Sequence, residues 1–370
     1  MDELSMRKAK LFKPIKIGPV ELKNRIVMAP MTRNRAANEH EAPTELHMEY
    51  YSQRSSAGLI LSEGSPVSPA ARGYIATAGI YNDAQEEGWK KVNRAVHEKN
   101  GHIQIQLWHV GRVSHPYFHN GEKPPAPSAI RPDAMSFTPD GFKPSPEPRE
   151  MTKDEIKSTI EDFRKAAARS KKAGFDGAQI HGANGYLIEQ FLHSSANQRT
   201  DEYGGSIEKR ARFLFEVIDA VAGEIGEERT SLRLSPSNLF NTGNDPDSKE
   251  LYKYVIEKLN GYNLSYLELV EALGDLTEHP HLVPNVTEHY RPLYNGVLMT
   301  NGEFSREEAI EVVENGTADM VSFARLFLAN PDLPERFEAN AELNEPDSDT
   351  FYGGRAEGYT DYPFLEDSTV

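Results

Sequence analysis

Short apolar runs alternate with longer amphipathic segments over most of this chain. Each run is rich in β-branched residues and ends at turn residues, a pattern typical of strands buried in a parallel sheet. Eight such runs are expected to be strands, and they span residues 25–31, 58–62, 102–107, 177–181, 231–234, 264–270, 296–299 and 320–323.

Each expected strand is followed by a segment with helical periodicity. The eight expected helices span residues 43–57, 83–100, 152–173, 207–225, 248–259, 283–294, 305–315 and 332–339. Three of them begin with an N-cap residue and a carboxylate in the first turn, at Asn82-Asp83, Thr152-Lys-Asp-Glu155 and Ser305-Arg-Glu-Glu308. Eight strand–helix units predict an α/β fold of the (β/α)8 TIM-barrel type rather than an open doubly wound sheet.

The chain has 370 residues, and we expect one domain over 1–370, because α/β barrels of this length commonly fold as a unit. Two segments interrupt the alternation. Residues 110–150 are rich in proline, glycine and histidine, which predicts a long loop excursion after the third strand. Residues 340–370 begin with an acidic stretch and continue with aromatic residues, so this tail is expected to fold back on the barrel.

Composition narrows the classes of function. The chain has 41 Lys and Arg against 57 Asp and Glu, a formal charge of −16, which disfavours nucleic acid and anionic membranes as partners. Cysteine is absent, which excludes disulfides, thiolate nucleophiles and iron–sulfur clusters. The chain shows no apolar leader and no run of about 18 apolar residues, so a cytoplasmic protein is expected.

Candidate chemistry gathers at the carboxyl ends of the expected strands, where the active site of a (β/α)8 barrel lies. The residues at these ends are Pro30, Met31, Thr32, Glu63, Gly64, Gln106, His109, His181, Asn184, Arg233, Asn301, Gly302, Ala324 and Arg325. A hydroxyl, a primary amide and an arginine at one mouth can satisfy a planar heterocycle with imide carbonyls, and flavin fits this description.

The loops after the seventh and eighth strands favour a cofactor with a phosphate tail. Gly302 permits close backbone approach, and the guanidinium of Arg325 can hold phosphate through a fork. The sequence contains neither Gly-x-Gly-x-x-Gly nor a Walker-type loop, so a separate dinucleotide-binding domain is not expected.

The segment after the fourth expected strand indicates chemistry on a carbonyl compound. His181 and Asn184 can each donate a hydrogen bond to one carbonyl oxygen, and Tyr186 can supply a proton nearby. Taken alone, His181 is more often structural, and Arg233 could be held in a structural salt bridge. His109, His115 and His119 could be metal ligands, but their proline-rich setting argues against a regular helix, so no metal is expected.

Six segments strengthen this interpretation: Asn24-Arg-Ile-Val-Met-Ala-Pro-Met-Thr-Arg33, Ile105-Gln-Leu-Trp-His-Val-Gly-Arg112, His181-Gly-Ala-Asn-Gly-Tyr-Leu187, Asn197-Gln-Arg-Thr-Asp-Glu-Tyr-Gly-Gly-Ser206, Leu232-Arg-Leu-Ser-Pro236 and Gly358-Tyr-Thr-Asp-Tyr-Pro363. They resemble, in order, motifs of the Old Yellow Enzyme family of FMN-dependent ene-reductases. The resemblance covers nearly the whole chain. Thr32 stands where a related branch has cysteine, which places the chain nearer the classical branch.

The resemblance implies roles for the candidate residues. Thr32 would bond the flavin O4 region, Gln106 the pyrimidine edge and Arg233 the N1/O2 locus. Residues lining the ring would be Pro30, Met31 and Gly64, and those around ribityl and phosphate would be Asn301, Gly302, Ala324 and Arg325. His181 and Asn184 would bind the substrate carbonyl and Tyr186 would protonate the α-carbon. Tyr74, Phe240, Phe351 and Tyr352 would form the substrate wall, although Tyr74, Phe240 and Tyr352 taken singly are more typical of aromatic packing than of substrate contact.

One position departs from the family pattern. Ala324 stands where the family usually has glycine before the arginine, and its methyl group is expected to crowd the phosphate.

The implied activity is a ping-pong reaction in which NADPH or NADH reduces FMN and an activated C=C bond of an α,β-unsaturated carbonyl compound is then reduced. The partner would be a small-molecule alkene, and the protein a monomer or homodimer. Two alternatives stay open: a reductase acting mainly on nitrate esters or nitro compounds, and a noncatalytic barrel that binds flavin or phenols. A flavin-free lyase or aldolase is disfavoured, because none of the strand ends named above carries a Schiff-base lysine.

Overall fold

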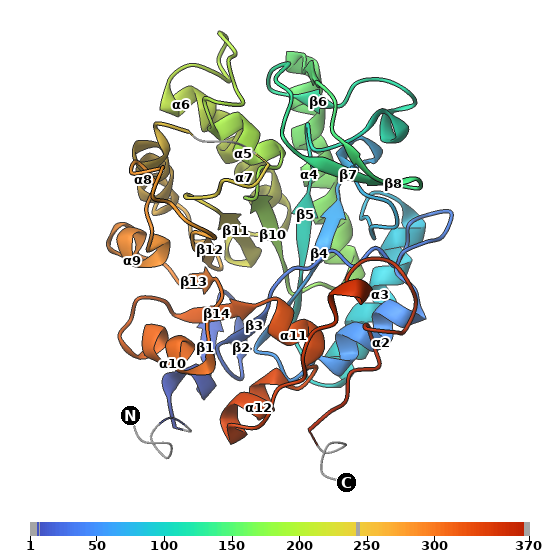
Figure 1. The fold of residues 1–370 in the computed structure, drawn as a ribbon, viewed down its shortest axis with the longest axis vertical. Helices are drawn as coiled ribbons and strands as arrows, with labels where there is room; N and C mark the ends of the chain where they lie inside the picture. Colours follow the sequence, from blue (N-terminus) through green and yellow to red (C-terminus); the bar gives the residue numbers. More distant parts are fainter. Residues whose placement is uncertain (1–5, 7, 242–244, 366–370) are drawn as a thin grey trace.

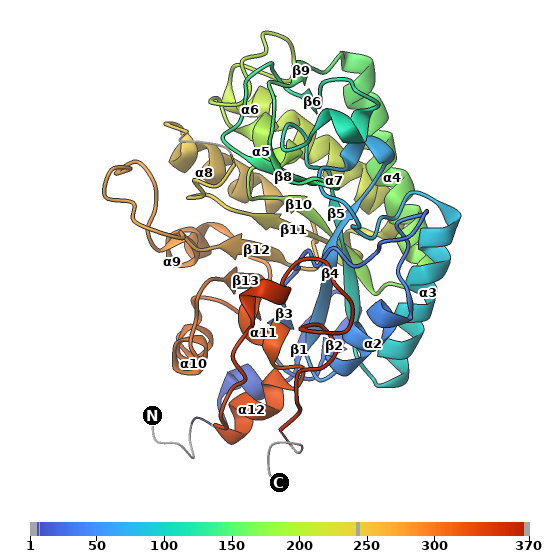
Figure 2. The ribbon, with the colours of Figure 1, turned by 45° about the vertical axis from the view of Figure 1, so that its right-hand side comes forward.

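The computed structural model describes residues 6, 8–241 and 245–365. Eight strands close into a barrel through parallel pairing, with β14 pairing back to β3, and helices surround it (Figures 1 and 2). The strands are β3 (Ile26–Met28), β4 (Leu59–Pro66), β5 (Ile103–Trp108), β10 (Gly177–Gly182), β11 (Thr230–Leu234), β12 (Leu267–Val270), β13 (Leu298–Asn301) and β14 (Met320–Phe323). The predicted (β/α)8 barrel is confirmed.

All eight predicted strands are present, although several ends differ. β4 continues to Pro66, past the predicted end at residue 62, and β13 continues to Asn301, past residue 299. The sequence pattern ended both strands at their first polar residues. In the barrel these polar residues stay in the strand because they are buried among hydrogen-bond partners.

The outer helices follow the predicted alternation: α2 (Glu45–Gln53), α3 (Asp83–Glu98), α4 (Lys153–Ala173), α6 (Ile207–Arg210), α7 (Arg212–Ile225), α8 (Ser248–Leu259), α9 (Val286–Tyr290), α10 (Arg306–Glu314) and α12 (Leu333–Ala339). The expected helix 207–225 is divided at Ala211 into α6 and α7. The expected helix 283–294 is wrong in length, because a 3-10 turn, η5 (Arg291–Leu293), with Pro292 in its first turn, follows the short α9. Capping boxes close the first turns of α3, α4 and α10, as predicted.

Two short helices follow barrel strands directly and were not predicted. α5 (Leu187–Leu192) follows β10, and α11 (Arg325–Ala329) follows β14. The 3-10 turns η1 (Lys10–Phe12), η2 (Pro69–Ala71), η4 (Glu227–Arg229) and η6 (Ser348–Thr350) complete the local helical structure. Because α5 and α11 begin at the carboxyl ends of their strands, they lie beside the expected active site.

An antiparallel hairpin closes the other end of the barrel. It consists of β1 (Ile15–Ile17) and β2 (Val20–Leu22), which the sequence pattern did not predict. Ile17 and Leu22 are buried with Leu59, Met299 and Met320 in one apolar cluster inside the barrel. This packing leaves the carboxyl ends of the strands as the open end.

The excursion over residues 110–150 carries secondary structure of its own. It contains η3 (Pro116–His119), the parallel pair β6 (Pro125–Ala126) and β9 (Arg149–Glu150), and the antiparallel hairpin β7 (Met135–Thr138) with β8 (Gly141–Pro144). Backbone bonds from Ile75 N to Phe137 O (2.9 Å) and from Phe137 N to Gly73 O (3.2 Å) attach the hairpin to the segment after β4. The hairpin is therefore held over the open end of the barrel.

The C-terminal segment lies against the loop after β3 and against α2 (Figure 1). Arg33 donates to the carbonyls of residues 350, 351 and 358, and Arg35 donates to those of residues 350, 355 and 357. Tyr359 is fully buried and stacks on Tyr50, with ring centroids 3.9 Å apart. These contacts fix Phe351 and Tyr352 near the open end.

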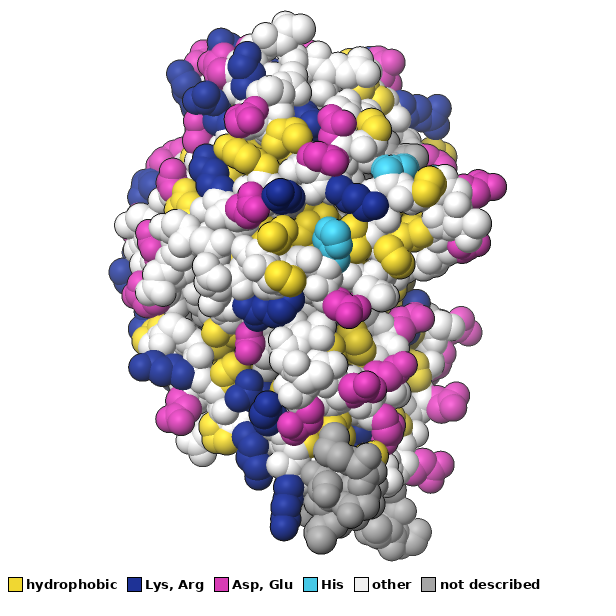
Figure 3. Space-filling view, turned by 90° about the vertical axis from the view of Figure 1, so that its left-hand side faces the viewer, with side chains coloured by type: hydrophobic (Ala, Val, Ile, Leu, Met, Phe, Trp, Pro, Cys, Tyr) yellow, Lys and Arg dark blue, Asp and Glu magenta, His cyan; other side chains and the backbone are white. Residues whose placement is uncertain are grey.

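Acidic and basic side chains are interspersed on the face that Figure 3 shows, with small apolar groups between them. Within the described residues, none of the helices combines the length and the apolar character that a membrane span requires.

Candidate active site

Three adjoining cavities lie at the carboxyl ends of the barrel strands. The deep cavity, of about 100 Å³, and the mouth cavity, of about 540 Å³, share Pro30, Thr32, Trp108 and Tyr186. The lateral cavity, of about 700 Å³, shares Ala324 and Arg325 with the mouth cavity. The three volumes therefore form one continuous region around the loops that follow the strands.

Every candidate cofactor and substrate residue from the sequence lines one of these cavities. The deep cavity is lined by Pro30, Thr32, Gly64, Gln106, His181, Asn184, Tyr186 and Arg233. The mouth cavity adds Met31, Tyr74, Phe240, Ala324, Arg325, Phe351 and Tyr352. The lateral cavity adds Asn301 and Gly302.

Strand register explains why the deep cavity collects polar groups. His181 in β10 is aligned with Arg233 in β11, and Gly64 in β4 is aligned with Gln106 in β5. Gln106 is aligned with Gln179, two residues before His181. Because alternate residues of a barrel strand face inward, the four positions face the cavity from neighbouring strands, with the His181–Arg233 pair one step further along than the Gly64–Gln106 pair.

Arg233 is held in an ion pair and also lines the deep cavity. Its guanidinium donates to Glu268 at 2.8 Å and to Asn301 at 2.7 Å, and Glu268 is fully buried. Its Nε–H is buried and has no hydrogen-bond partner among the described residues. Both interpretations of Arg233 are therefore compatible. The ion pair with Glu268 fixes the guanidinium in place, and the Nε–H remains available to donate to a ligand.

Glu268 anchors a polar network beneath the cavity and was missed in the sequence. Gln106 donates to Gln179 at 2.9 Å, Gln179 donates to Glu268 at 2.7 Å, and Ser322 donates to Glu268 at 2.6 Å. This network fixes the Gln106 amide while leaving its carbonyl oxygen for a ligand. The available signal was a single carboxylate within the apolar run of β12.

Gly64 is required by the packing of its neighbour. A β-carbon at this position would lie 2.7 Å from Cε3 of Trp108, closer than real contacts allow. The glycine thus lets the Trp108 indole lie over β4, where it contributes to both the deep and the mouth cavity.

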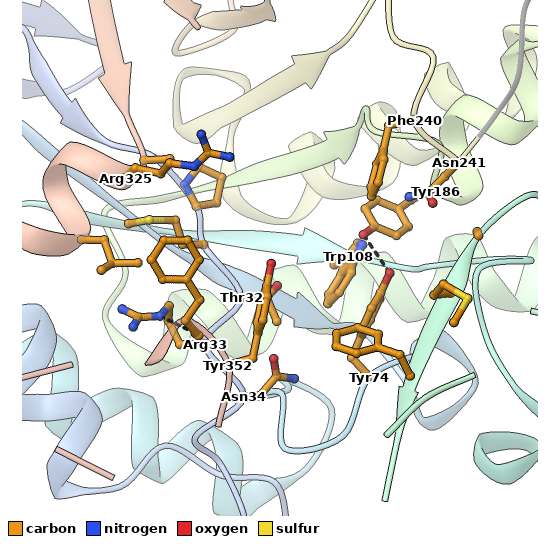
Figure 4. A pocket seen from close by; sticks show the side chains of 18 of the residues that line it. Thr32, Arg33, Asn34, Tyr74, Trp108, Tyr186, Phe240, Asn241, Arg325 and Tyr352 are labelled. Carbon is orange, nitrogen blue, oxygen red and sulfur yellow. Dashed lines mark hydrogen bonds between the residues drawn. The ribbon is translucent and has the colours of Figure 1, made fainter. Parts of the chain in front are cut away.

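His181, Asn184 and Tyr186 meet beside Trp108. The Tyr186 ring centroid is 5.2 Å from that of His181 and 5.0 Å from that of Trp108. The Tyr186 hydroxyl is 3.3 Å from that of Tyr74 (Figure 4). His181 Nδ1 is buried without a hydrogen-bond partner in the described part of the chain, so this nitrogen is open to a ligand.

The protonation states of these groups suit hydrogen-bond donation. Burial lowers the pKa of His181 well below its usual range, and the nearby charge of Arg233 lowers it further. Burial raises the pKa of Tyr186 well above 10 and that of Tyr74 to about 12. At neutral pH His181 is therefore uncharged and Tyr186 keeps its proton.

Exposed aromatic side chains surround the mouth cavity. Phe240 is 64% exposed and Tyr352 is 54% exposed, which is unusual for rings of this size and typical of a binding surface. Met135 and Phe142, from the β7–β8 hairpin, also line the cavity and were missed in the sequence. The Phe142 ring centroid is 6.3 Å from that of Tyr352. The alternation of apolar residues within the proline-rich excursion was the available signal for these two positions.

The lateral cavity places Ala324 and Arg325 next to Gly302. Ala324 has a φ of −94°, which any residue can adopt, so its backbone does not need glycine. The Arg325 guanidinium is 70% exposed and forms an ion pair with Glu303 at 3.2 Å. Glu303 also lines the cavity and was not among the sequence candidates.

Two strand-end residues lie outside the cavities, contrary to expectation. Glu63 is buried against α2, where Tyr51 Oη lies 3.4 Å from its carboxylate. His109 is buried in the loop after β5, where its Nδ1 accepts from Gly111 N–H at 3.0 Å. β4 is irregular between Leu61 and Gly64, and this shift in register turns Glu63 outward although Leu59 and Leu61 face the barrel interior. His109 lies one residue past the end of β5, next to Trp108, which lines the deep cavity.

His115 and His119 make local hydrogen bonds in the excursion. His115 Nδ1 accepts from Tyr117 N–H at 3.2 Å, and His119 Nε2 lies 2.9 Å from Ser114 Oγ. The described residues contain no group of three or more His, Cys, Asp or Glu arranged to hold a metal ion.

Comparisons with known proteins agree with this geometry. Residues 10–344 match the family described as NADH:flavin oxidoreductase / NADH oxidase. 12-oxophytodienoate reductase 1 of Oryza sativa subsp. japonica is 45% identical over 363 residues, covering 96% of this chain and 93% of that protein. A probable flavin mononucleotide-dependent alkene reductase of Leishmania infantum is 44% identical, covering 96% and 97%. The solved structure of an old yellow enzyme homologue from Zymomonas mobilis has a TM-score of 0.92 at 41% identity, covering 96% of this chain and 100% of that one.

Proposed function

From the membership of this chain in the NADH:flavin oxidoreductase / NADH oxidase family, we propose that it reduces the activated C=C bond of α,β-unsaturated carbonyl compounds. This membership agrees with the resemblance of its sequence motifs to those of the Old Yellow Enzyme family. The observation that carries this proposal is the group of three side chains, His181, Asn184 and Tyr186, beside a deep polar cavity at the barrel mouth. Relatives named as 12-oxophytodienoate and alkene reductases support the same substrate class.

The cavity residues fit FMN. The unpaired Nε–H of Arg233 is a buried donor beside a cation, which suits the carbonyl edge of an isoalloxazine ring. Thr32 and Gln106 supply further polar groups to the same cavity. Asn301, Gly302 and Arg325 border the lateral cavity, where a phosphate tail would lie.

FMN, when bound, supplies the redox chemistry by accepting a hydride from NAD(P)H and returning one to the β-carbon of the alkene. His181 and Asn184 donate hydrogen bonds to the substrate carbonyl oxygen, which withdraws electron density from that β-carbon. The Tyr186 hydroxyl gives its proton to the α-carbon, and its raised pKa keeps this proton in place until then. Trp108 and Tyr74 fix the Tyr186 ring through packing and one hydroxyl contact.

Three finer points belong to the same proposal. Either NADH or NADPH serves as the hydride donor, and it binds at the same mouth cavity as the alkene. The enzyme works in the cytoplasm on small molecules, and it is a monomer or a homodimer. Anaerobic reduction with each nicotinamide and sedimentation of the purified protein measure the first and the last of these points.

The proposal is tested with the purified, FMN-loaded protein. We expect anaerobic bleaching by NADH or NADPH, followed by rapid reoxidation with 2-cyclohexenone. Replacing His181 or Asn184 by alanine should slow the second step roughly a hundredfold, the usual cost of one oxyanion donor, about 3 kcal/mol. Reoxidation only by nitrate esters or nitro compounds would point to the alternative reductase, and reduction by neither nicotinamide would point to a noncatalytic flavin binder.

A further inference from the structure

A tight bend precedes Tyr186. Asn184 has a φ of 58° and Gly185 a φ of 77°, so two successive residues are in the left-handed region. For a residue with a side chain, such as Asn184, this conformation is less favourable than the ordinary right-handed or extended one. Contacts with the rest of the protein must therefore hold the bend that carries the Asn184 side chain.

Both peptide N–H groups of the bend are bound through one carboxylate. Gly185 N–H donates directly to Glu189 Oε2 at 2.5 Å. Asn184 N–H donates to Ser235 Oγ at 2.8 Å, and Ser235 Oγ–H donates to Glu189 Oε1 at 2.9 Å. Because the serine hydroxyl has only one proton, its bond to Glu189 turns the oxygen lone pairs toward Asn184 N–H.

The two carbonyl groups of the bend are bound from other elements. Asn241 Nδ2 donates to Asn184 O at 3.1 Å, and Gln190 Nε2 donates to Gly185 O at 2.8 Å. All four backbone polar groups of the bend are thus satisfied. Since Glu189 is fully buried and Ser235 is nearly so, water cannot readily replace either of them.

Glu189 belongs to α5, the short helix that Tyr186 caps. The carboxylate therefore joins three parts of the site: α5, the bend of Asn184 and Gly185 before Tyr186, and Ser235 just after β11. Tyr252 in α8 donates to the same Oε1 at 3.0 Å, but it does not contact the bend.

We propose that Glu189, acting through Ser235, is a positioning residue that sets the Asn184 amide toward the substrate carbonyl oxygen and the Tyr186 hydroxyl toward the α-carbon. This inference rests on the proposed function. Neither Glu189 nor Ser235 touches the reacting atoms, and their effect is carried by the conformation of residues 184 and 185.

The test compares Ser235→Ala and Glu189→Gln with Tyr252→Phe as the matched control. Ser235→Ala removes the link between the carboxylate and Asn184 N–H, whereas Tyr252→Phe removes a donor to the same oxygen without altering the bend. In the holoenzyme we expect Ser235→Ala to slow enone reduction about tenfold or more, because small misplacements of catalytic groups are costly. Tyr252→Phe should change the rate less than twofold, and Ser235→Thr, which keeps the hydroxyl, should restore most of it.

Hydrogen–deuterium exchange provides a readout that does not depend on activity. Peptides covering the bend should exchange faster in Ser235→Ala and in Glu189→Gln, and at the wild-type rate in Tyr252→Phe. A double-mutant cycle with Asn184→Ala separates positioning from general destabilisation. If Ser235 acts through Asn184, Ser235→Ala should add little to the loss already caused by Asn184→Ala.

The outcomes are distinguishable. A wild-type holoenzyme that fails to reduce enones contradicts the proposed function before any variant is compared. An active wild type whose Ser235→Ala variant keeps full activity and slow exchange contradicts the positioning role. The positioning role is also contradicted if Ser235→Ala slows enone reduction by the same factor in the wild type and in the Asn184→Ala variant. The effect of Ser235 would then not depend on Asn184 and would be general destabilisation.

Discussion

Tyr186 differs from the other residues of the site in having a proton to give. Burial and the neighbouring Tyr74 keep its pKa well above 10, so it is protonated at any pH used for assays. We expect Tyr186→Phe to slow alkene reduction by about two orders of magnitude, the usual effect of losing a general acid. Reduction of the flavin by NAD(P)H should stay within a factor of two, because that half-reaction needs no proton from tyrosine.

Anaerobic stopped-flow absorbance measures the two half-reactions separately. Tyr74→Phe is the control, since it removes the hydroxyl partner at 3.3 Å but leaves the Tyr186 proton. Equal slowing of both half-reactions by Tyr186→Phe would mean that the residue acts on the flavin site and not on the alkene.

Glu303 puts a negative charge where a phosphate is expected. Its carboxylate is 3.2 Å from Arg325, and both side chains are more than two-thirds exposed. Such an exposed ion pair contributes little to the stability of the protein. The Glu303 carboxylate nevertheless competes with phosphate for the Arg325 guanidinium and repels a phosphate dianion. We expect Glu303→Ala to tighten FMN binding by roughly two- to fivefold at low salt, with a smaller gain at high salt.

Quenching of FMN fluorescence on titration of the apoprotein gives this affinity. Glu307→Ala is a suitable control, because Glu307 lines the same cavity but pairs with Arg306. Unchanged or weaker FMN binding in Glu303→Ala, or an equal gain in Glu307→Ala, would show that Glu303 does not compete for the phosphate.

Sequence alone identified the residues that line the cavities better than the residues that support them. His181, Arg233 and Gln106 were identified because polar residues follow several expected strands at one end of the barrel and lie in segments that resemble family motifs. Glu268 and Glu189 could not be recognised in this way, since their roles depend on partners 35 and 46 residues away along the chain. Glu63 and His109 show the opposite error, because the face of the strand, and not its end, decides where a side chain points.

The β7–β8 hairpin contributes Met135 and Phe142 to the lining of the mouth cavity. Phe142 is 50% exposed and lies edge-on to Tyr352, so the hairpin and the C-terminal segment together form one aromatic wall. We expect Phe142→Ala to raise KM for bulky apolar enones about three- to tenfold, through the loss of about 0.7 to 1.4 kcal/mol of apolar contact. The KM for 2-cyclohexenone should change little, because a small ring lies deeper than Phe142.

Steady-state kinetics with a series of enones of increasing size measures this effect. Tyr117→Ala gives a matched control, since Tyr117 is an exposed aromatic residue of the same excursion that lies outside the cavity lining. A uniform rise of KM across the series would indicate general damage to the site, and no rise for the largest substrates would remove Phe142 from the wall.

Elements with a regular periodicity were predicted, and elements without one were not. The eight barrel strands and the capped helices α3, α4 and α10 follow from patterns within a single segment. The strands β7 and β8 and the helices α5 and α11 are each six residues or fewer. Such short elements are stabilised by tertiary contacts, for example those between Phe137 and the segment after β4.

At the scale of the whole molecule, the alternation of strands and helices was enough to predict a closed barrel. The polar interior was not predictable, because a barrel core is usually apolar and here Gln104, Gln179, Tyr266 and Glu268 form a hydrogen-bonded chain inside it. This chain connects the cation at the site to the middle of the barrel. Folding therefore has to bury ionisable groups. Because their pKa values differ between the folded and the unfolded protein, the free energy of unfolding depends on pH.

Glu63 is the group for which this contribution is most easily measured. Burial raises its pKa from 4.5 to about 7, and its Oε2 has no hydrogen-bond partner among the described residues. In the unfolded chain the carboxyl loses its proton near pH 4.5, whereas in the folded protein it keeps the proton until about pH 7. The free energy of unfolding should therefore fall as the pH rises through this window, by about 3 kcal/mol from this one group, and stay level above it.

Glu63→Gln replaces the acid by a neutral group of the same shape and should remove this dependence. Relative to the wild type, the variant should gain stability steadily between pH 4.5 and 7 and keep that gain at pH 8. Denaturation of the FMN-saturated proteins by guanidinium at several pH values gives the difference, in which the contribution of the similarly shifted Glu189 cancels. A constant difference for Glu63→Gln would mean that Glu63 is ionised in the folded protein, with Arg33 and Arg35 compensating its burial.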